Sequence, residues 1–264
     1  MSSLIFNKFW KAAIVVIGNE ILIGRVLDTN SYKIAKMLTM IGYDVTEIRK
    51  VRDDVEVIAK TIKELMLDNG VIITTGGLGP TYDDLTAEAL AYAVGSPLCL
   101  KDDALEMVRE RLEKMGLKLD DTRKKMAIIP CISVPIPNPV GVAPGIALFT
   151  PRTKIFSLPG VPKEMEAMME KYVLPILEKE NLMVRAEACE RLEGVREADI
   201  APMIAEFAKE HPEIYVKTHP GIENGKSFVK LCIMASAESK EEAERRAKSL
   251  LKNLLNRIAQ SGAL

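Results

Sequence analysis

The sequence predicts an α/β domain with a mostly parallel sheet, followed by a small α+β domain. Over the first two-thirds of the chain, short β-branched runs alternate with segments of helical period, as in a parallel sheet covered by helices. The last third instead reads as strand, helix, strand, strand and helix. Since 264 residues fit one or two domains, we expect one domain over 1–178 and another over 183–264.

The first domain starts with the apolar run AAIVVI, which fits a strand buried on both faces. Asp28–Asn30 are residues that often cap helices, and the helix after them should stop at Gly42. Periodicity then predicts a strand at 45–51, a helix from Val55 to Met66, the strand VIITT at 71–75, a helix after the next turn, and a helix from Leu105 to Gly116.

The rest of the chain changes character at Cys131. Prolines and glycines surround two short apolar runs, IALFT and KIFSL, which favour extended segments. Pro162 suits the first turn of a helix that Pro175 should kink or break. The order βαββα then follows, with a clean apolar face on the last helix from about Lys240.

Composition and charge exclude several classes of protein. Thirty-six Lys and Arg against 37 Asp and Glu give a net charge of −1, which supplies no general attraction for nucleic acid or an anionic membrane. No apolar run reaches the ~20 residues of a membrane span, and the start is unlike a signal peptide, so we expect a cytoplasmic protein. The four cysteines lie more than 30 residues apart, which favours buried free thiols.

The strongest functional signal is the turn GGLGPTYDDLT after the strand 71–75. Glycines let backbone N–H groups approach an anion, and the following helix start adds more of them, so the turn fits a phosphate cradle. It matches neither the Walker nor the dinucleotide-binding pattern. Asp83 and Asp84 either cap the helix or hold a hard cation such as Mg²⁺ against the phosphate.

Two further stretches should reach the same sheet edge. Glu20 follows the first strand and is either a solvated loop residue or a carboxylate with a functional role at this edge. Asp28 is a candidate helix cap. The segments 138–145 and 158–165 are either rigid ligand-facing loops or plain connectors. Arg123, Lys124 and Lys125 are candidate charges for a phosphate, or a solvated helix face.

These motifs together resemble a known family. GNEILIGRVLDTN, TTGGLGPTYDDLTAEALA, NPVGVAPG and LPGVPKEM look like the amino-terminal domain of CinA, a relative of the molybdopterin-binding fold of MogA, MoaB and MoeA. The trailing segment with ERLEGVREADIAPMI resembles the KH-like domain of CinA proteins. The carboxy-terminal amidase of full-length CinA has no counterpart here, so we expect no deamidase activity.

The resemblance implies a three-layer α/β/α domain that acts as a metal-dependent pyrophosphatase on ADP-ribose or a related nucleoside diphosphate. The alternative is a molybdopterin- or nucleotide-binding protein of molybdenum cofactor biosynthesis, without hydrolysis. We assign catalysis to Asp84 and Asp83, and the divalent metal, Mg, Mn or Co, to Asp84 and Glu20. Ligand or phosphate binding is assigned to Gly76, Gly77, Leu78, Gly79, Thr81, Lys125, Asn138 and Gly145.

The second domain offers little for catalysis or for RNA. Its segment Gly221–Gly225 is one residue too long for the GXXG loop of a working KH domain, so we expect no nucleic-acid partner. His211 and His219 are the only histidines and both lie there, which argues against a histidine base in the first domain. We expect an interaction unit, in a homodimer or homotrimer.

Overall fold

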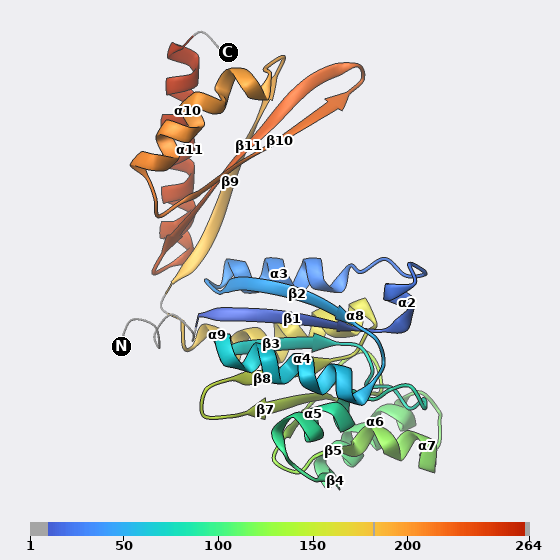
Figure 1. Cartoon of the computed structure of the whole chain (residues 1–264). Helices are drawn as coiled ribbons and strands as arrows, with labels where there is room; N and C mark the ends of the chain where they lie inside the picture. The colour runs from blue at the N-terminus through green and yellow to red at the C-terminus, as the bar shows by residue number, and fades with distance from the viewer. Residues whose placement is uncertain (1–9, 182, 262–264) are drawn as a thin grey trace. The chain divides into compact units, whose positions relative to one another are not determined.

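The computed structural model describes residues 10–181 and 183–261, and the chain divides into two compact units after Glu180. The second unit takes the chain from Asn181 onward, together with Met40–Gly42. Each unit has its own sheet (Figure 1).

The first unit is built on a six-stranded sheet in the order β2, β1, β3, β8, β7, β6 (Figure 1). Four neighbouring strands, β2, β1, β3 and β8, run parallel to one another. Strands β7 and β6 are antiparallel to their neighbours. The predicted, mostly parallel sheet is confirmed. The strands are β1 (Lys11–Ile17), β2 (Asp44–Val51), β3 (Val71–Thr75), β6 (Val134–Ile136), β7 (Gly145–Phe149) and β8 (Lys154–Leu158).

Helices cover this sheet, and the alternation of side chains along β1 shows how. Ala13, Val15 and Ile17 join one core cluster with buried side chains of α4, α5 and α6. The intervening Ala12 and Ile14 are fully buried as well, so β1 is covered on both faces, as its apolar run predicts. The helices are α2 (Asn19–Leu22), α3 (Asn30–Met40), α4 (Val55–Asp68), α5 (Thr86–Val94), α6 (Asp102–Lys114), α7 (Asp121–Lys124), α8 (Pro162–Met168) and α9 (Leu174–Glu178).

The break expected at Pro175 is confirmed. A π-helical turn over Met169–Val173 separates α8 from α9, and Pro175 lies in the first turn of α9. Proline has no backbone N–H, so it removes a helical hydrogen bond at this point, and the π turn accommodates the change of register.

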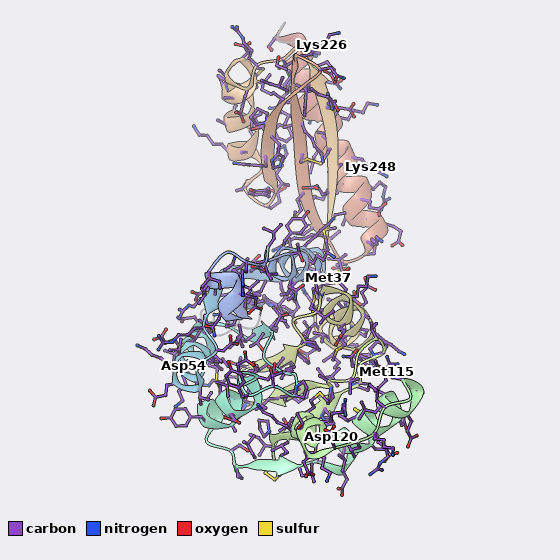
Figure 2. The ribbon with its side chains drawn as sticks, turned by 90° about the vertical axis from the view of Figure 1, so that its right-hand side faces the viewer. Met37, Asp54, Met115, Asp120, Lys226 and Lys248 are labelled. Carbon is purple, nitrogen blue, oxygen red and sulfur yellow. A yellow bond between two sulfur atoms is a disulfide. The ribbon has the colours of Figure 1, made fainter. Side chains whose placement is uncertain are left out.

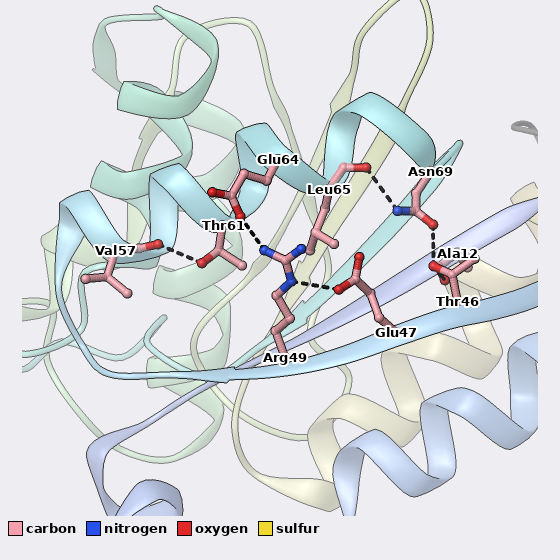
Figure 3. Close-up of polar contacts among 9 residues, drawn as sticks. All are labelled: Ala12, Thr46, Glu47, Arg49, Val57, Thr61, Glu64, Leu65 and Asn69. Carbon is pink, nitrogen blue, oxygen red and sulfur yellow. Dashed lines mark hydrogen bonds and ion pairs between the residues drawn. The ribbon is translucent and has the colours of Figure 1, made fainter.

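Polar contacts tie α4 to the edge of the sheet (Figure 3). The Thr46 hydroxyl of β2 lies 2.7 Å from Asn69 Oδ1, and Asn69 Nδ2 donates to the carbonyl of Leu65 in α4 at 3.0 Å. Arg49 of β2 bridges Glu47 and Glu64, and these two carboxylates raise the pKa of its guanidinium. The edge strand is thus held at two points, by Glu64 of α4 and by Asn69 just after it.

The second unit has the predicted order βαββα. Strands β9 (Val184–Glu193), β10 (Tyr215–Glu223) and β11 (Lys226–Ala237) form an antiparallel sheet in the order β10, β11, β9. Helices α10 (Glu197–Glu210) and α11 (Lys240–Gln260) pack on one face, which buries Leu192, Leu231 and Ile233. The opposite face carries charged side chains such as Arg191 and Lys230.

The expectation of free thiols is wrong, because all four cysteines form disulfides, drawn as yellow bonds in Figure 2. Cys189 and Cys232 are direct partners in the antiparallel pairing of β9 with β11, with Cα atoms 4.1 Å apart. Cys99 in β4 (Leu98–Leu100) bonds to Cys131, just after β5 (Ile128–Pro130), which pairs with β4. Spacing along the chain cannot reveal such pairs, since strand pairing creates them.

Candidate ligand pocket at the strand ends

A pocket of about 600 Å³ lies where the parallel strands of the first unit end. Its wall contains Ile17 at the end of β1, Gly76 after β3, and Pro159 after β8. Ligands of open α/β sheets bind at this carboxyl edge of the strands. The predicted stretches at Glu20 and at Gly76 do reach the same cavity.

The glycine loop 76–79 forms part of the pocket wall. Gly76 and Gly77 have φ values of 107° and 66°, a region that favours glycine, and a Cβ on Gly76 would overlap the carbonyl of Ile17. The Thr86 hydroxyl at the start of α5 donates to the Gly76 carbonyl at 2.8 Å, which holds the loop. Among the described residues, the N–H groups of Gly77, Leu78 and Gly79 have no acceptor, so they can bind an anion.

Thr81 orients the two aspartates that follow the loop. Its backbone N–H donates to Asp84 Oδ2 at 2.8 Å, and its hydroxyl lies within hydrogen-bond distance of Asp83 and Asp84. A hydrogen bond from Thr81, aided by the charge of Lys125, lowers the pKa of Asp83, so this group is ionised at neutral pH. The first alternative for this pair, capping, is wrong, because the N-cap position of α5 is Leu85 and no side chain makes a capping hydrogen bond there.

Three more carboxylates line the same pocket: Glu20, Asp53 and Glu164. Asp53 follows β2 and accepts from the Asn19 N–H at 2.8 Å. Burial raises the pKa of Asp53, the charges of Glu20 and Asp83 raise it further, and the Asn19 bond only partly offsets them. Glu164, near the start of α8, accepts from Asn138 Nδ2 at 2.7 Å.

Asp53 and Glu164 line the pocket although no motif in the sequence singles them out. Asp53 lies just beyond β2, as Glu20 lies just beyond β1, so its place at the end of a parallel strand was a usable signal. Glu164 belongs to the stretch 158–165, in which no single residue was chosen. The Glu164 carboxylate is held by Asn138, which is 26 positions away in the chain, so the local sequence does not single Glu164 out.

The basic residues divide between two cavities. Arg123 lines the main pocket, and its guanidinium also contacts the Lys118 carbonyl at 3.0 Å and Asp120. Lys125 instead lines a cavity of about 80 Å³ on the glycine loop and donates to the Thr81 carbonyl at 2.6 Å. Lys124 pairs with Asp121. Figure 2 labels Met115 and Asp120, which mark this α6–α7 segment.

Asn138 and Gly145 do not line the main pocket. Asn138 is buried, and its side chain holds the loop that follows: Nδ2 donates to the Ala143 carbonyl at 2.8 Å, and Oδ1 accepts from the Gly141 N–H at 2.7 Å. Gly141, Val142 and Ala143 of this loop reach the pocket. Asn138 therefore positions the wall, while Gly145 begins β7, where a Cβ would lie 2.8 Å from the Ser157 carbonyl.

Comparisons with known proteins agree with this geometry. Residues 13–179 match the family described as probable molybdopterin binding domain. The chain belongs to this family. The structure is also similar to the crystal structure of CinA, a protein with unknown function from Thermoplasma acidophilum. The TM-score is 0.60 and the sequences are 40% identical, over 64% of this chain and 99% of that one.

The similarity to two relatives extends into the second unit. A protein of Pyrobaculum calidifontis is 43% identical over 94% of this chain and 95% of its own length. A protein of Aeropyrum pernix is 42% identical over 96% of this chain and 95% of its own length. Both units therefore occur together in these relatives. Among the described residues, no helix is both long and apolar enough to cross a membrane.

Proposed function

We propose that the first unit is a metal-dependent hydrolase that cleaves the diphosphate linkage of ADP-ribose or a related nucleoside diphosphate. The observation that carries this proposal is the contrast within one pocket between a loop that offers N–H groups to an anion and the carboxylates around it. These carboxylates would repel a diphosphate unless a cation lay between them. They are Glu20, Asp53, Asp83, Asp84 and Glu164.

The donor groups fit a divalent metal. Carboxylate oxygens are the ligands that Mg²⁺ and Mn²⁺ prefer, and Asp84, with Asp83 or Glu20, would hold the ion. Asp53 extends this set, because its pKa is raised by burial and by the negative charges that a cation would offset. When bound, such an ion neutralises phosphate charge and makes water a better nucleophile.

The remaining residues bind and orient. The free N–H groups of Gly77, Leu78 and Gly79 would bind the phosphate that is not attacked, and Arg123 would add positive charge from the pocket wall. Thr81 fixes the direction of the Asp84 carboxylate, and Lys125 in turn holds the carbonyl of Thr81. His211 and His219 are the only histidines and both belong to the second unit, so the first unit supplies no histidine as a general base.

Metal-dependent release of AMP tests the proposal. The purified chain is incubated with ADP-ribose and Mg²⁺, Mn²⁺ or Co²⁺, with a chelator in parallel, and AMP and ribose 5-phosphate are measured by chromatography. We expect both products with at least one metal, and their loss with the chelator. No AMP with any of the three metals would overturn the proposal.

The second candidate function is binding of molybdopterin or a nucleotide without hydrolysis, as in molybdenum cofactor assembly. The membership in the molybdopterin-binding family favours it. It predicts that a fluorescent pterin copurifies with the chain, or that calorimetry detects pterin binding. It also predicts that ADP-ribose stays intact in every metal.

For the second unit, we propose a KH-like interaction role in a cytoplasmic homodimer or homotrimer. Its support is the sheet face opposite the helices, where Arg191 lies over the ring of Phe228 at 3.7 Å. Arg191 also forms ion pairs with Glu193 and Glu223, each at 2.6 Å. These carboxylates neutralise its positive charge, which disfavours a nucleic-acid backbone as partner. A monomeric mass in light scattering would contradict this role.

A further inference from the structure

A smaller pocket of about 70 Å³ adjoins the main one. Ile17, Glu20 and Gly160 line both cavities. Since roughly 10–15 Å³ of such volume holds one water, the smaller pocket has room for a larger group. Six of the twelve residues that line it have apolar side chains: Val16, Ile17, Ile21, Val26, Leu27 and Pro162.

Asn30, the first residue of α3, is a polar member of this wall and is 7% exposed. Its Nδ2 donates to Thr75 Oγ1 at 2.9 Å and to the Gly160 carbonyl at 2.8 Å. The Thr75 hydroxyl donates its own proton to the Pro159 carbonyl at 2.9 Å, so it must accept from Asn30. These bonds fix the orientation of the Asn30 amide.

Asn30 Oδ1 is thereby left as a buried acceptor, and within residues 10–181 and 183–261 it has no donor. Its neighbour Asp28 is different, because its carboxylate accepts from the Ser31 N–H at 3.0 Å and from Lys50 at 3.2 Å. Asp28 caps α3, as one reading of the sequence predicts. An unmatched buried acceptor is unfavourable, so a donor that reaches Asn30 Oδ1 gains a hydrogen bond that water does not already satisfy.

We propose that the smaller pocket takes the amino-bearing edge of a heteroaromatic ring, with an N–H group donating to Asn30 Oδ1. This inference rests on the proposed function, because the ring belongs to the ligand whose phosphates lie at the glycine loop. The apolar side chains of the wall suit a ring edge, and the oxygens of Asn30 and Glu20 select an amine over a carbonyl. Adenine and pterin both present such an edge.

Ile21, Val26 and Leu27 belong to the part of the pocket wall that precedes Asn30 in the chain. Asn30 Oδ1 is covered in this conformation, so part of the wall must move for a donor to reach it. Ile23 and Leu27 are 68% and 83% exposed, and Gly24 lies between them at a φ of 72°. Side chains that contact little protein cost little to displace, and in the bound state they can pack on the ring.

Calorimetry on the full chain tests the inference, with Ca²⁺ present so that the pocket carboxylates do not repel the diphosphate, and with chromatography afterwards to check that the ligand is intact. ADP-ribose is compared with its hypoxanthine analogue, in which a carbonyl replaces the amine, and pterin is compared with lumazine, which lacks the 2-amino group. We expect the amine of the preferred ring to tighten binding about tenfold or more. Equal affinities within both pairs, or no binding of any of the four compounds, would overturn the inference.

Two variants separate the acceptor from the scaffold around it. Asn30→Ala removes Oδ1 and should bring the ratio of affinities within the pair close to one. Thr75→Val removes a partner of Nδ2 but keeps Oδ1, so the ratio should persist even if both affinities fall. A ratio that survives in Asn30→Ala contradicts the assignment. If Asn30→Ala does not fold, the wild-type ratio alone decides.

The outcome is independent of the hydrolase proposal. A protein that discriminates by the amine but releases no AMP with any metal keeps this inference and loses the proposed hydrolysis. A protein that hydrolyses ADP-ribose and its hypoxanthine analogue alike, and binds them equally, keeps the hydrolysis and loses this inference.

Discussion

The two units differ in how helices cover their sheets. In the first unit helices cover both faces, and the loops after β1, β2, β3 and β8 meet around one pocket. In the second unit helices cover one face of an antiparallel sheet, whose strands end at alternating edges. A parallel sheet collects the loops after its strands at one edge, so that residues distant in sequence can form one site.

The largest effect should come from the glycine that shapes this edge. Gly76→Ala should lower the free energy of unfolding by about 2–5 kcal/mol and abolish ligand binding, because the new Cβ meets the Ile17 carbonyl at a strained φ. The matched control is Gly194→Ala in the second unit, where φ is 72° and the added Cβ meets nothing within 4 Å. There we expect about 1–2 kcal/mol. Equal losses in urea unfolding would contradict this difference.

Removing a disulfide should act on the unit that contains it. The double variant Cys189→Ala with Cys232→Ala opens a loop closed over 43 residues and should destabilise the second unit by about 2–4 kcal/mol. ADP-ribose hydrolysis at the first unit should be unchanged. A scanning calorimeter reports the melting transitions, with and without a reductant. Wild-type melting temperatures that are the same with and without the reductant would argue against the disulfides.

The smallest effect should be a pH-dependent gain from Asp53→Asn. The folded state raises the pKa of Asp53, so the wild-type protein loses stability as pH rises from the ordinary value through the raised one. Above that window the variant should be the more stable, by at most about 1 kcal/mol, since partly exposed charges are screened. The two should converge at lower pH. A variant that is less stable than wild type at pH 7 without metal would contradict the charge crowding.

A carboxylate of the second unit should show the opposite pH dependence. Glu210 there has its pKa lowered by Arg257. Glu210 therefore stabilises the folded state above its ordinary pKa, and this stabilisation is lost as pH falls through the lowered pKa. Glu210→Gln should therefore reduce stability at neutral pH.

Much of the fold was accessible from the sequence because it follows from local periodicity. The run AAIVVI, the helix after Pro162 and the final βαββα order all depend on neighbours within a few residues. The short strands β4, β5 and β6 have three residues each and show no such pattern. The disulfides depend on strand pairing, so spacing alone predicted free thiols.

The site was predictable where motif and strand end coincide, as at Gly76 and Glu20. It was not predictable where the side chain acts through a distant partner. Asn138 looks like a ligand-facing residue in its loop, yet its amide binds Ala143 and Glu164. Lys125 was chosen for its charge, but Arg123 is the one that lines the main pocket.

The most direct measurement is the rate of AMP release from ADP-ribose by Asp84→Ala, in the metal that best supports the wild-type protein. The control is Asp199→Ala, which removes an aspartate of the second unit that pairs with Arg196. We predict that Asp84→Ala loses more than about a hundredfold in rate, since even indirect partners of a metal are worth 10–100-fold, whereas Asp199→Ala matches the wild type. Wild-type release of AMP by Asp84→Ala would contradict the metal site at the glycine loop.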